Sequence, residues 1–196
     1  RMNILIAEPL APAGVELFRA QAGWNVIVST PKEYQQHLET ADALLVRSVV
    51  QVNTDVLSKA PKLRVVGRAG VGVDNVDLEA ATAAGVLVMN TPGGNAISVA
   101  EHTLALMLAM ARRIPQANAS TRGGKWEKKK FMGNELRGKT LGVIGLGSIG
   151  RETVKRARAF EMKVVGHDPY VTTKIAEDFG VDLVPLEGLY AARDYI

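Results

Sequence analysis

Short apolar runs alternate with amphipathic segments along residues 1–90 of the chain. The apolar runs predict strands, and the segments between them have the spacing of helices with one buried face. Strands are expected at 3–7, 25–29, 43–46, 64–67 and 86–89, and helices at 12–22, 33–38, 55–60 and 77–84. Regular alternation of strand and helix is typical of a parallel sheet covered on both faces, so this part of the chain is predicted to be α/β.

A second α/β pattern begins at residue 140. It predicts strands at 140–144, 163–166 and 181–184, and helices that follow each of them to about 160, 179 and 192. A doubly wound dinucleotide-binding sheet has the strand order 3-2-1-4-5-6, and only strands 1, 2 and 3 are recognisable, followed by the start of another strand at Tyr195. We therefore predict the first half of a Rossmann doubly wound parallel sheet, with strand 1 unpaired on the side where strand 4 belongs.

A long helix is predicted between the two patterns. Residues 91–94 break the first pattern, and helical spacing then runs from 96 to at least 112, with 121 as its furthest end. Apolar and small side chains cover almost every face, so the helix is expected to be buried on more than one side. We interpret it as the joint between domains 1–91 and 92–196 and as a subunit contact. The alternative is a central helix of a monomer.

The motif Gly145-Leu146-Gly147-Ser148-Ile149-Gly150 joins strand 140–144 to the next helix. Its first glycine permits a tight turn, its second lets the backbone approach a pyrophosphate, and its third lets the helix pack against the strand. The pyrophosphate is then expected at the helix N-terminus, where unpaired N–H groups and the helix dipole favour an anion. The alternative is a glycine turn that binds no nucleotide.

Asp168 follows the second strand of this pattern, at the distance from the glycines where a carboxylate accepts hydrogen bonds from the adenosine ribose. Pro169 and Tyr170 come next, so no Lys or Arg stands beside Asp168 to receive a 2′-phosphate, which its own charge would repel. The predicted cofactor is therefore NAD rather than NADP.

The overall composition is that of a soluble globular protein, with 47% hydrophobic and 22% charged residues among 196. The most apolar stretch, 96–111, contains Glu101 and His102, so no membrane span is expected, and Arg1 and Met2 lead directly into a strand without a signal segment. The absence of cysteine fits a reducing compartment, and we expect a cytoplasmic protein. Because the residues behind the net charge of +4 are scattered, we predict an anionic small-molecule substrate and no nucleic acid.

Four separated motifs resemble the D-2-hydroxyacid dehydrogenases. They occupy positions 46–48, 67–75, 90–95 and 145–150, and the stretch 125–133 is similar to the branch of the family that acts on phosphoglycerate. The resemblance covers the whole chain but only part of that enzyme's catalytic unit. It implies that 1–91 is a flavodoxin-like substrate-binding domain and that 92–196 is an incomplete NAD-binding domain, including the helix that precedes it.

The reaction implied by the resemblance is oxidation of D-3-phosphoglycerate by NAD to 3-phosphohydroxypyruvate, the first step of serine biosynthesis. The family uses a His, a carboxylate and an Arg for the chemical step, and none of His37, His102 or His167 stands in an equivalent place, so no catalytic residue is assigned. The chain as given is expected to be inactive on its own. Two alternatives stay open: a non-catalytic fragment that binds NAD or adenine nucleotides, and a dehydrogenase of another 2-hydroxy acid.

Candidate substrate residues lie after strands of the first pattern. The turn Gly70-Val71-Gly72 offers consecutive N–H groups to a carboxylate, although a simple strand-to-helix turn would look the same. Arg47 and Arg68 stand at strand ends, where open sheets bind ligands, and with Ser48 they favour an anion site, although either arginine alone is more often a surface residue.

Two further candidates come from the resemblance. Asn95 is expected to cap the long helix, and its position faces the substrate in the family. Lys128, in a run of three lysines, is either part of a solvated loop or the basic residue that reaches the phosphate site of a neighbouring subunit. The family's assembly implies a homodimer or homotetramer through the 96–121 helix and the coenzyme domain.

Overall fold

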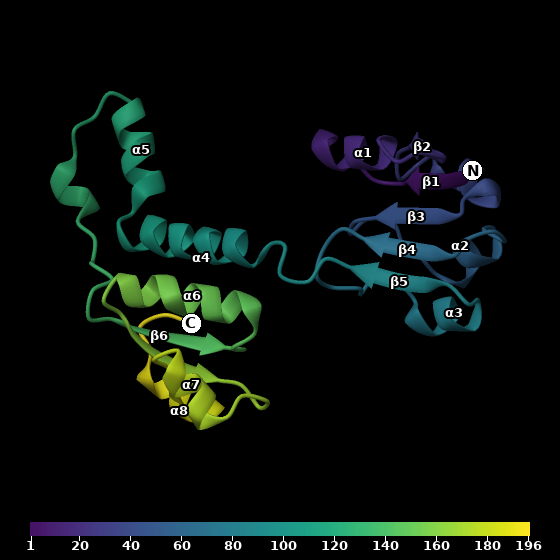
Figure 1. The fold of residues 1–196 in the computed structure, drawn as a ribbon. Coiled ribbons are helices and arrows are strands. Elements are labelled where there is room, and N and C mark those ends of the chain that lie inside the picture. Colours follow the sequence, from purple (N-terminus) through teal and green to yellow (C-terminus); the bar gives the residue numbers. More distant parts are fainter. The chain divides into compact units, whose positions relative to one another are not determined.

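The computed structural model describes residues 1–196, except for the side chain of Ala192. The chain divides into two compact units, Arg1–Gly94 and Asn95–Ile196. Both contain parallel strands with helices between them (Figure 1), so the predicted α/β class is confirmed. The division falls within the Thr-Pro-Gly-Gly turn, slightly later than the sequence-based boundary after residue 91.

The first unit contains a five-stranded sheet with the order β2-β1-β3-β4-β5. Its strands are all parallel: β1 (Met2–Ile6), β2 (Trp24–Val28), β3 (Ala43–Val46), β4 (Val65–Arg68) and β5 (Leu87–Asn90). This is the flavodoxin-like order. The direction of winding reverses between β1 and β3, and such a reversal leaves a crevice for ligands at the carboxyl ends of the two strands.

Three elements pack on one face of this sheet: η1 (Tyr34–Thr40), α2 (Thr54–Ser58) and α3 (Leu78–Ala83). The segment predicted as a helix at 33–38 forms the tighter 3₁₀ helix η1 instead. The main core of the unit lies here, where alternate strand residues meet these elements: Leu5, Leu44 and Val66 from the sheet, and Leu38, Val56 and Ala81 from the covering elements.

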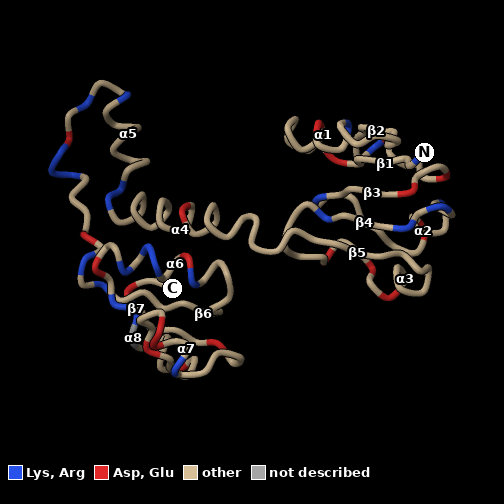
Figure 2. Tube along the Cα trace, viewed as in Figure 1, with Lys and Arg blue, Asp and Glu red and all other residues tan. Residues whose placement is uncertain are grey.

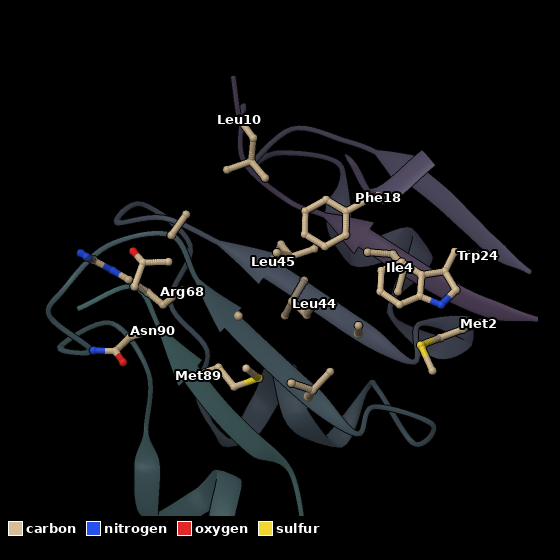
Figure 3. Close-up of a pocket in the computed structure, with 15 residues that line it drawn as sticks. Met2, Ile4, Leu10, Phe18, Trp24, Leu44, Leu45, Arg68, Met89 and Asn90 are labelled. Carbon is tan, nitrogen blue, oxygen red and sulfur yellow. The ribbon is translucent and has the colours of Figure 1, made fainter. Parts of the chain in front are cut away.

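The opposite face is only partly covered. Helix α1 (Pro12–Arg19) packs there, and its Phe18 stacks on Trp24 with 6.0 Å between the ring centres. An apolar groove of about 510 Å³ continues along β3, β4 and β5 (Figure 3). Arg68 and Asn90 lie at one end of the groove with their polar ends directed away from it.

The second unit contains the order β6-β7-β8, again parallel, with β6 (Thr140–Ile144), β7 (Lys163–His167) and β8 (Asp182–Leu183). Tyr195 forms an isolated parallel bridge with Leu141 on the free side of β6, and the N–H of Gly142 donates to its carbonyl at 2.8 Å. This is the side on which a Rossmann sheet places strand 4. The connections are α6 (Ser148–Ala159), α7 (Thr173–Asp178) and α8 (Leu186–Ala192).

The predicted 96–121 helix is two helices, α4 (Ala96–Ala111) and α5 (Ile114–Arg122). Arg113 between them adopts the left-handed conformation with φ of 52°, and Pro115 occupies the first turn of α5. Proline cannot donate a helical hydrogen bond and clashes with the carbonyl four residues earlier, so a single helix cannot pass this point. The prediction of one continuous helix to 121 was therefore wrong, although 114–122 is helical, and a subunit contact through this segment stays a prediction.

One side of α4 is buried within its own unit. Leu104, Met107 and Ala111 share a core with Val154 and Ala157 of α6. The other side keeps two large apolar residues exposed, Leu106 and Met110, and Ile97 is exposed in the first turn of the helix. Within the described residues, α4 and the other helices are too short or too polar to cross a lipid bilayer.

Candidate functional site

Two of the three glycines in the loop after β6 are required by the fold, one for its backbone conformation and one for close packing. Gly145 has φ of +91°, a conformation that side chains other than glycine rarely adopt. A Cβ atom on Gly150 would overlap the carbonyl oxygen of Gly145, so the close packing of α6 on β6 depends on this glycine. Gly147 is different, because a Cβ atom placed there meets nothing within 4 Å.

The N-terminus of α6 follows directly. Gly147 is its N-cap residue and supplies no side-chain hydrogen bond to the first amides of the helix. The N–H groups of Ser148, Ile149 and Gly150 have no acceptor within the helix itself, as in every first helical turn. Ser148 and Ile149 are both exposed, so these amides and the helix dipole face an accessible surface that suits an anion.

Asp168 lies beside this loop and is held by backbone amides. Its Oδ2 accepts a hydrogen bond from Leu146 N at 2.8 Å, and its Oδ1 accepts one from Tyr170 N at 2.8 Å. These two amides, that of Leu146 first, keep the pKa of the carboxyl below its ordinary value. An ionised carboxylate has about four acceptor sites. Asp168 can therefore accept further hydrogen bonds from hydroxyl groups while it stays fixed to the loop.

Arg151 was not predicted from the sequence. Its Nε donates to the carbonyl of Leu146 at 2.8 Å, and its guanidinium lies 4.5 Å from the centre of the Phe179 ring. Asp168 and Arg151 thus fix the two peptide groups that flank the Leu146 Cα atom. An arginine directly after the last glycine of the motif was the available signal for this contact.

The first unit brings Arg47, Ser48 and Arg68 together at the carboxyl edge of its sheet. Arg47 and Ser48 follow β3, and Arg68 ends the neighbouring strand β4. Arg68 Nε donates to the carbonyl of Arg47 at 3.0 Å. Arg47 Nη1 reaches the carbonyl of Pro9 at 3.4 Å. Two guanidinium groups and a hydroxyl therefore lie next to the reversal between β1 and β3.

The turn Gly70-Val71-Gly72 adjoins these side chains. Its carbonyl groups are tied down, because Thr91 N donates to Gly70 O at 2.9 Å and Asn90 Nδ2 donates to Val71 O at 2.7 Å. The amides of Val71 and Gly72 have no hydrogen-bond acceptor among the described residues. A Cβ atom on Gly70 would overlap the Arg68 guanidinium. The turn thus presents two free N–H groups beside the Arg68 guanidinium, and the Asp74 carboxylate lies against Gly72.

Glu8 and Asn75 form a polar layer beneath this edge that sequence reasoning missed as part of the site. Each is 3% exposed, and both bind the backbone of the loop that carries Arg47. Glu8 comes two residues after β1, at the reversal of the sheet, and an acid directly after a buried strand could have drawn attention to it. Asn75 stands where a pyrophosphate loop would have its third glycine.

Asn95 and Lys128 belong to the second unit. Asn95 is the N-cap residue of α4, but its side chain makes no capping hydrogen bond, so the expected side-chain cap is absent from the structure as described. Lys128 begins the 3₁₀ helix η2 (Lys128–Phe131) and is exposed. Figure 2 shows basic segments of this loop on either side of an acidic one. The acid between Lys125 and Lys128 in the sequence is Glu127, and its carboxylate lies 3.5 Å from Lys130 Nζ.

Other chemistry has little support in the part of the chain that the structure describes. No group of three or more His, Cys, Asp or Glu residues there could hold a metal ion. His167 Nδ1 lies 3.1 Å from the carbonyl of Val184, His37 is in η1 and His102 is in α4. The groove of Figure 3 is lined mainly by apolar side chains, and its polar lining residues, Arg68, Asn90 and Thr91, lie together at the carboxyl ends of β4 and β5, so most of the groove does not suit an anionic substrate.

Comparison with known proteins shows the family of this chain. The family model "D-isomer specific 2-hydroxyacid dehydrogenase, catalytic domain" matches residues 4–182. A D-3-phosphoglycerate dehydrogenase of Archaeoglobus fulgidus is 50% identical over 198 residues, which cover 100% of this chain and 37% of that protein. The chain therefore spans well under half the length of the curated relatives it matches.

Two solved structures show the same fold. The TT0316 protein from Thermus thermophilus has a TM-score of 0.89 and 34% identity, over 98% of this chain and 63% of its own. D-lactate dehydrogenase from Aquifex aeolicus, complexed with NAD and lactic acid, has a TM-score of 0.83 and 26% identity, over 98% of this chain and 58% of its own. The resemblance predicted from four sequence motifs is confirmed: this chain belongs to the D-isomer specific 2-hydroxyacid dehydrogenases.

Proposed function

We propose that the protein oxidises D-3-phosphoglycerate to 3-phosphohydroxypyruvate with NAD. In this proposal the first unit binds the substrate, and the second unit binds the adenosine and pyrophosphate part of the cofactor. The 50% identity to a D-3-phosphoglycerate dehydrogenase supports the choice of substrate. The proposal concerns the complete protein, since this chain corresponds to 37% of that relative.

The observation that carries the proposal is the pairing of the Gly147 loop with Asp168. The residues fit an NAD molecule: the open space above Gly147 admits a pyrophosphate to the first amides of α6, and Asp168 retains acceptor capacity for the ribose hydroxyls. The packing around α6 leaves room for a side chain at residue 147, where glycine also serves as the N-cap residue. The charge of Asp168, whose pKa is held low first by the Leu146 amide, disfavours the 2′-phosphate of NADP.

The substrate's two anionic groups match the two kinds of donor at the carboxyl edge of the first unit. The free amides of Val71 and Gly72 would bind the carboxylate next to the reacting carbon. The guanidinium groups of Arg47 and Arg68, with the Ser48 hydroxyl, would bind the phosphate end or share the carboxylate. Asn95 and Lys128 are proposed as further contacts, and for Lys128 the contact would be with the site of a neighbouring subunit.

NAD supplies the hydride acceptor when it is bound. The residues of this chain bind and orient the two reactants, and orientation of a bound pair lowers the barrier because its entropy has already been lost on binding. We propose that the protein assembles as a dimer or tetramer through the second unit. The exposed apolar residues Leu106 and Met110 of α4, and Trp126, which is 84% exposed, support this surface as a contact.

Titration of the chain with NAD in a calorimeter tests the cofactor site. We expect binding by the wild type and a loss of roughly 10- to 100-fold in affinity for D168A, since hydrogen bonds to a charged acceptor contribute about 1.5–3 kcal/mol. D194A is the control, because Asp194 is another carboxylate of the second unit that accepts a backbone hydrogen bond, from Thr140 N at 2.8 Å. A well-folded wild type that takes up no NAD would refute the proposal.

Turnover by the complete protein tests the reaction. NADH formation with D-3-phosphoglycerate, compared with D-lactate, distinguishes the proposed substrate from another 2-hydroxy acid. Binding of NAD without turnover of either acid would instead favour the non-catalytic alternative.

A further inference from the structure

Glu8 places a buried carboxylate under the loop that carries the proposed anion-binding residues. Its Oε1 accepts hydrogen bonds from Arg47 N at 2.8 Å, Val50 N at 3.0 Å and Val49 N at 3.2 Å, and its Oε2 accepts one from Val49 N at 3.1 Å. Glu8 is only 3% exposed. An ionised carboxylate is buried at a large cost unless several donors surround it, and this loop supplies them.

The backbone of Arg47 is fixed on both sides of its Cα atom. Its amide donates to Glu8, and its carbonyl accepts hydrogen bonds from Arg68 Nε at 3.0 Å and Asn75 Nδ2 at 3.0 Å. Asn75 Nδ2 also donates to the carbonyl of Val50 at 2.7 Å, so the two ends of the loop are bound to one amide group. The Arg47 side chain therefore starts from a backbone that cannot shift without breaking several hydrogen bonds.

The same segment also directs the Arg47 guanidinium. Pro9 directly follows Glu8, and its carbonyl accepts the hydrogen bond from Arg47 Nη1 at 3.4 Å. Because Glu8 occupies the amides of Arg47, Val49 and Val50, these N–H groups are not available to a substrate. Anion binding on this loop is left to the Arg47 guanidinium and the Ser48 hydroxyl, while free amides are found on the turn at Val71 and Gly72.

We propose that Glu8 is a positioning residue of the substrate site, which acts by fixing the loop 47–50 so that Arg47 and Ser48 meet the anionic group of the substrate. This inference rests on the proposed function. It assigns to the reversal between β1 and β3 a buried acid that touches neither substrate nor cofactor. The hydrogen bonds to the loop backbone, rather than the volume of the side chain, carry its effect.

The test compares E8Q with D42N in the complete protein. Glutamine keeps the size of Glu8 but removes its charge. It also places an NH₂ donor where the wild type has a carboxylate oxygen that accepts from the loop amides. Asp42 is a matched control, because its Oδ2 accepts a backbone hydrogen bond from Asn3 N at 2.7 Å at the other end of the same two strands. We expect E8Q to raise KM for D-3-phosphoglycerate by about 10- to 100-fold, the effect of a small displacement of a binding group, with KM for NAD unchanged. D42N should leave both KM values unchanged.

A double-mutant cycle with R47A separates positioning from a general loss of stability. If Glu8 acts through Arg47, E8Q should add little to the KM of R47A, whereas two independent effects would multiply and would overturn the proposal. If E8Q does not fold, E8D replaces it in the test. Aspartate keeps the negative charge, but its side chain is one methylene shorter, so the carboxylate lies further from the loop. We then expect a smaller rise in KM for D-3-phosphoglycerate, which should also disappear when Arg47 is already replaced by alanine. A wild type that does not saturate with D-3-phosphoglycerate removes the proposed function and the role of Glu8 together. A wild type that saturates, with E8Q or E8D indistinguishable from it, overturns only the role of Glu8.

Discussion

Replacing Gly147 with alanine distinguishes a glycine that admits a ligand from one that only turns the chain. Gly147 has φ of −71°, which any residue can adopt, and an added Cβ meets no atom within 4 Å. Sterically the chain does not require glycine here, but Gly147 is the N-cap residue of α6, where alanine is less favourable, so we expect G147A to lower the free energy of unfolding by only about 0.5–1 kcal/mol. A pyrophosphate at the N-terminus of α6 would, however, meet the new methyl group. Loss of one amide-to-phosphate hydrogen bond costs about 1.5–3 kcal/mol, or roughly 10- to 100-fold in NAD affinity.

The assay pairs thermal unfolding with calorimetric titration of NAD for three variants. G150A should lose both stability, by about 1–3 kcal/mol, and affinity, because its Cβ overlaps the carbonyl of Gly145 and displaces α6. G188A is the neutral control: its nearest neighbour is 3.7 Å away, and alanine in the helix α8 should gain about 0.5–1 kcal/mol without affecting NAD. If G147A binds NAD as tightly as the wild type, the pyrophosphate does not approach this loop and the argument for the cofactor site is wrong.

Local geometry supports three further predictions. G70A should weaken binding of D-3-phosphoglycerate by about tenfold without changing NAD affinity, because the new Cβ displaces the Arg68 guanidinium. The KM for D-3-phosphoglycerate measures this effect, and a KM equal to that of the wild type would contradict the prediction. R113G should raise the free energy of unfolding in urea by about 1 kcal/mol, since φ of 52° is unfavourable for arginine, whereas R112G, at φ of −104°, should not. The pKa of Glu8 is lowered from 4.5: burial opposes this, but the amides of Val50, Arg47, Val49 and Ser48 outweigh it. Ionised Glu8 therefore contributes its full stability above pH 4.5, and this contribution is lost as the pH falls through the lowered pKa of the folded state. The difference in unfolding free energy between wild type and E8Q should shrink as the solution is acidified. A difference that does not depend on pH would contradict this prediction.

The strands of both units were predictable because burial on both faces leaves a continuous apolar run in the sequence. Predicted and observed ends agree to within a residue or two at β1, β3 and β6. The continuous helix beyond Arg112 was not correct, although Pro115 was visible and is a physical reason for a break. Apolar spacing continues across Arg113 to Ile114, so the hydrophobic pattern alone did not show that the backbone turns there.

The candidate sites divide in the same way. The glycine loop at 145–150 is predictable because each glycine there satisfies a local requirement, of conformation, packing or access. The role of Glu8 is not, because its partners are backbone amides 39 to 42 positions further along the chain. Every residue type except proline offers the same N–H group, so these contacts leave little mark on the sequence around Arg47. Only the strand order, which sets β1 beside β3, brings them together.

Glu8 and Asp168 share one hydrogen-bonding arrangement but have different proposed roles. Each acid follows a parallel strand and accepts the amide of the loop after the neighbouring strand: Glu8 follows β1 and binds the loop after β3, and Asp168 follows β7 and binds Leu146 after β6. What differs is access. Glu8 is buried and both of its oxygens are taken by the loop, so its charge can only position other groups. Asp168 is partly exposed and each of its oxygens accepts one amide, so the same attachment leaves capacity for a ligand. Burial, rather than residue type or place in the topology, therefore decides which acid can bind a ligand and which can only hold a binding loop.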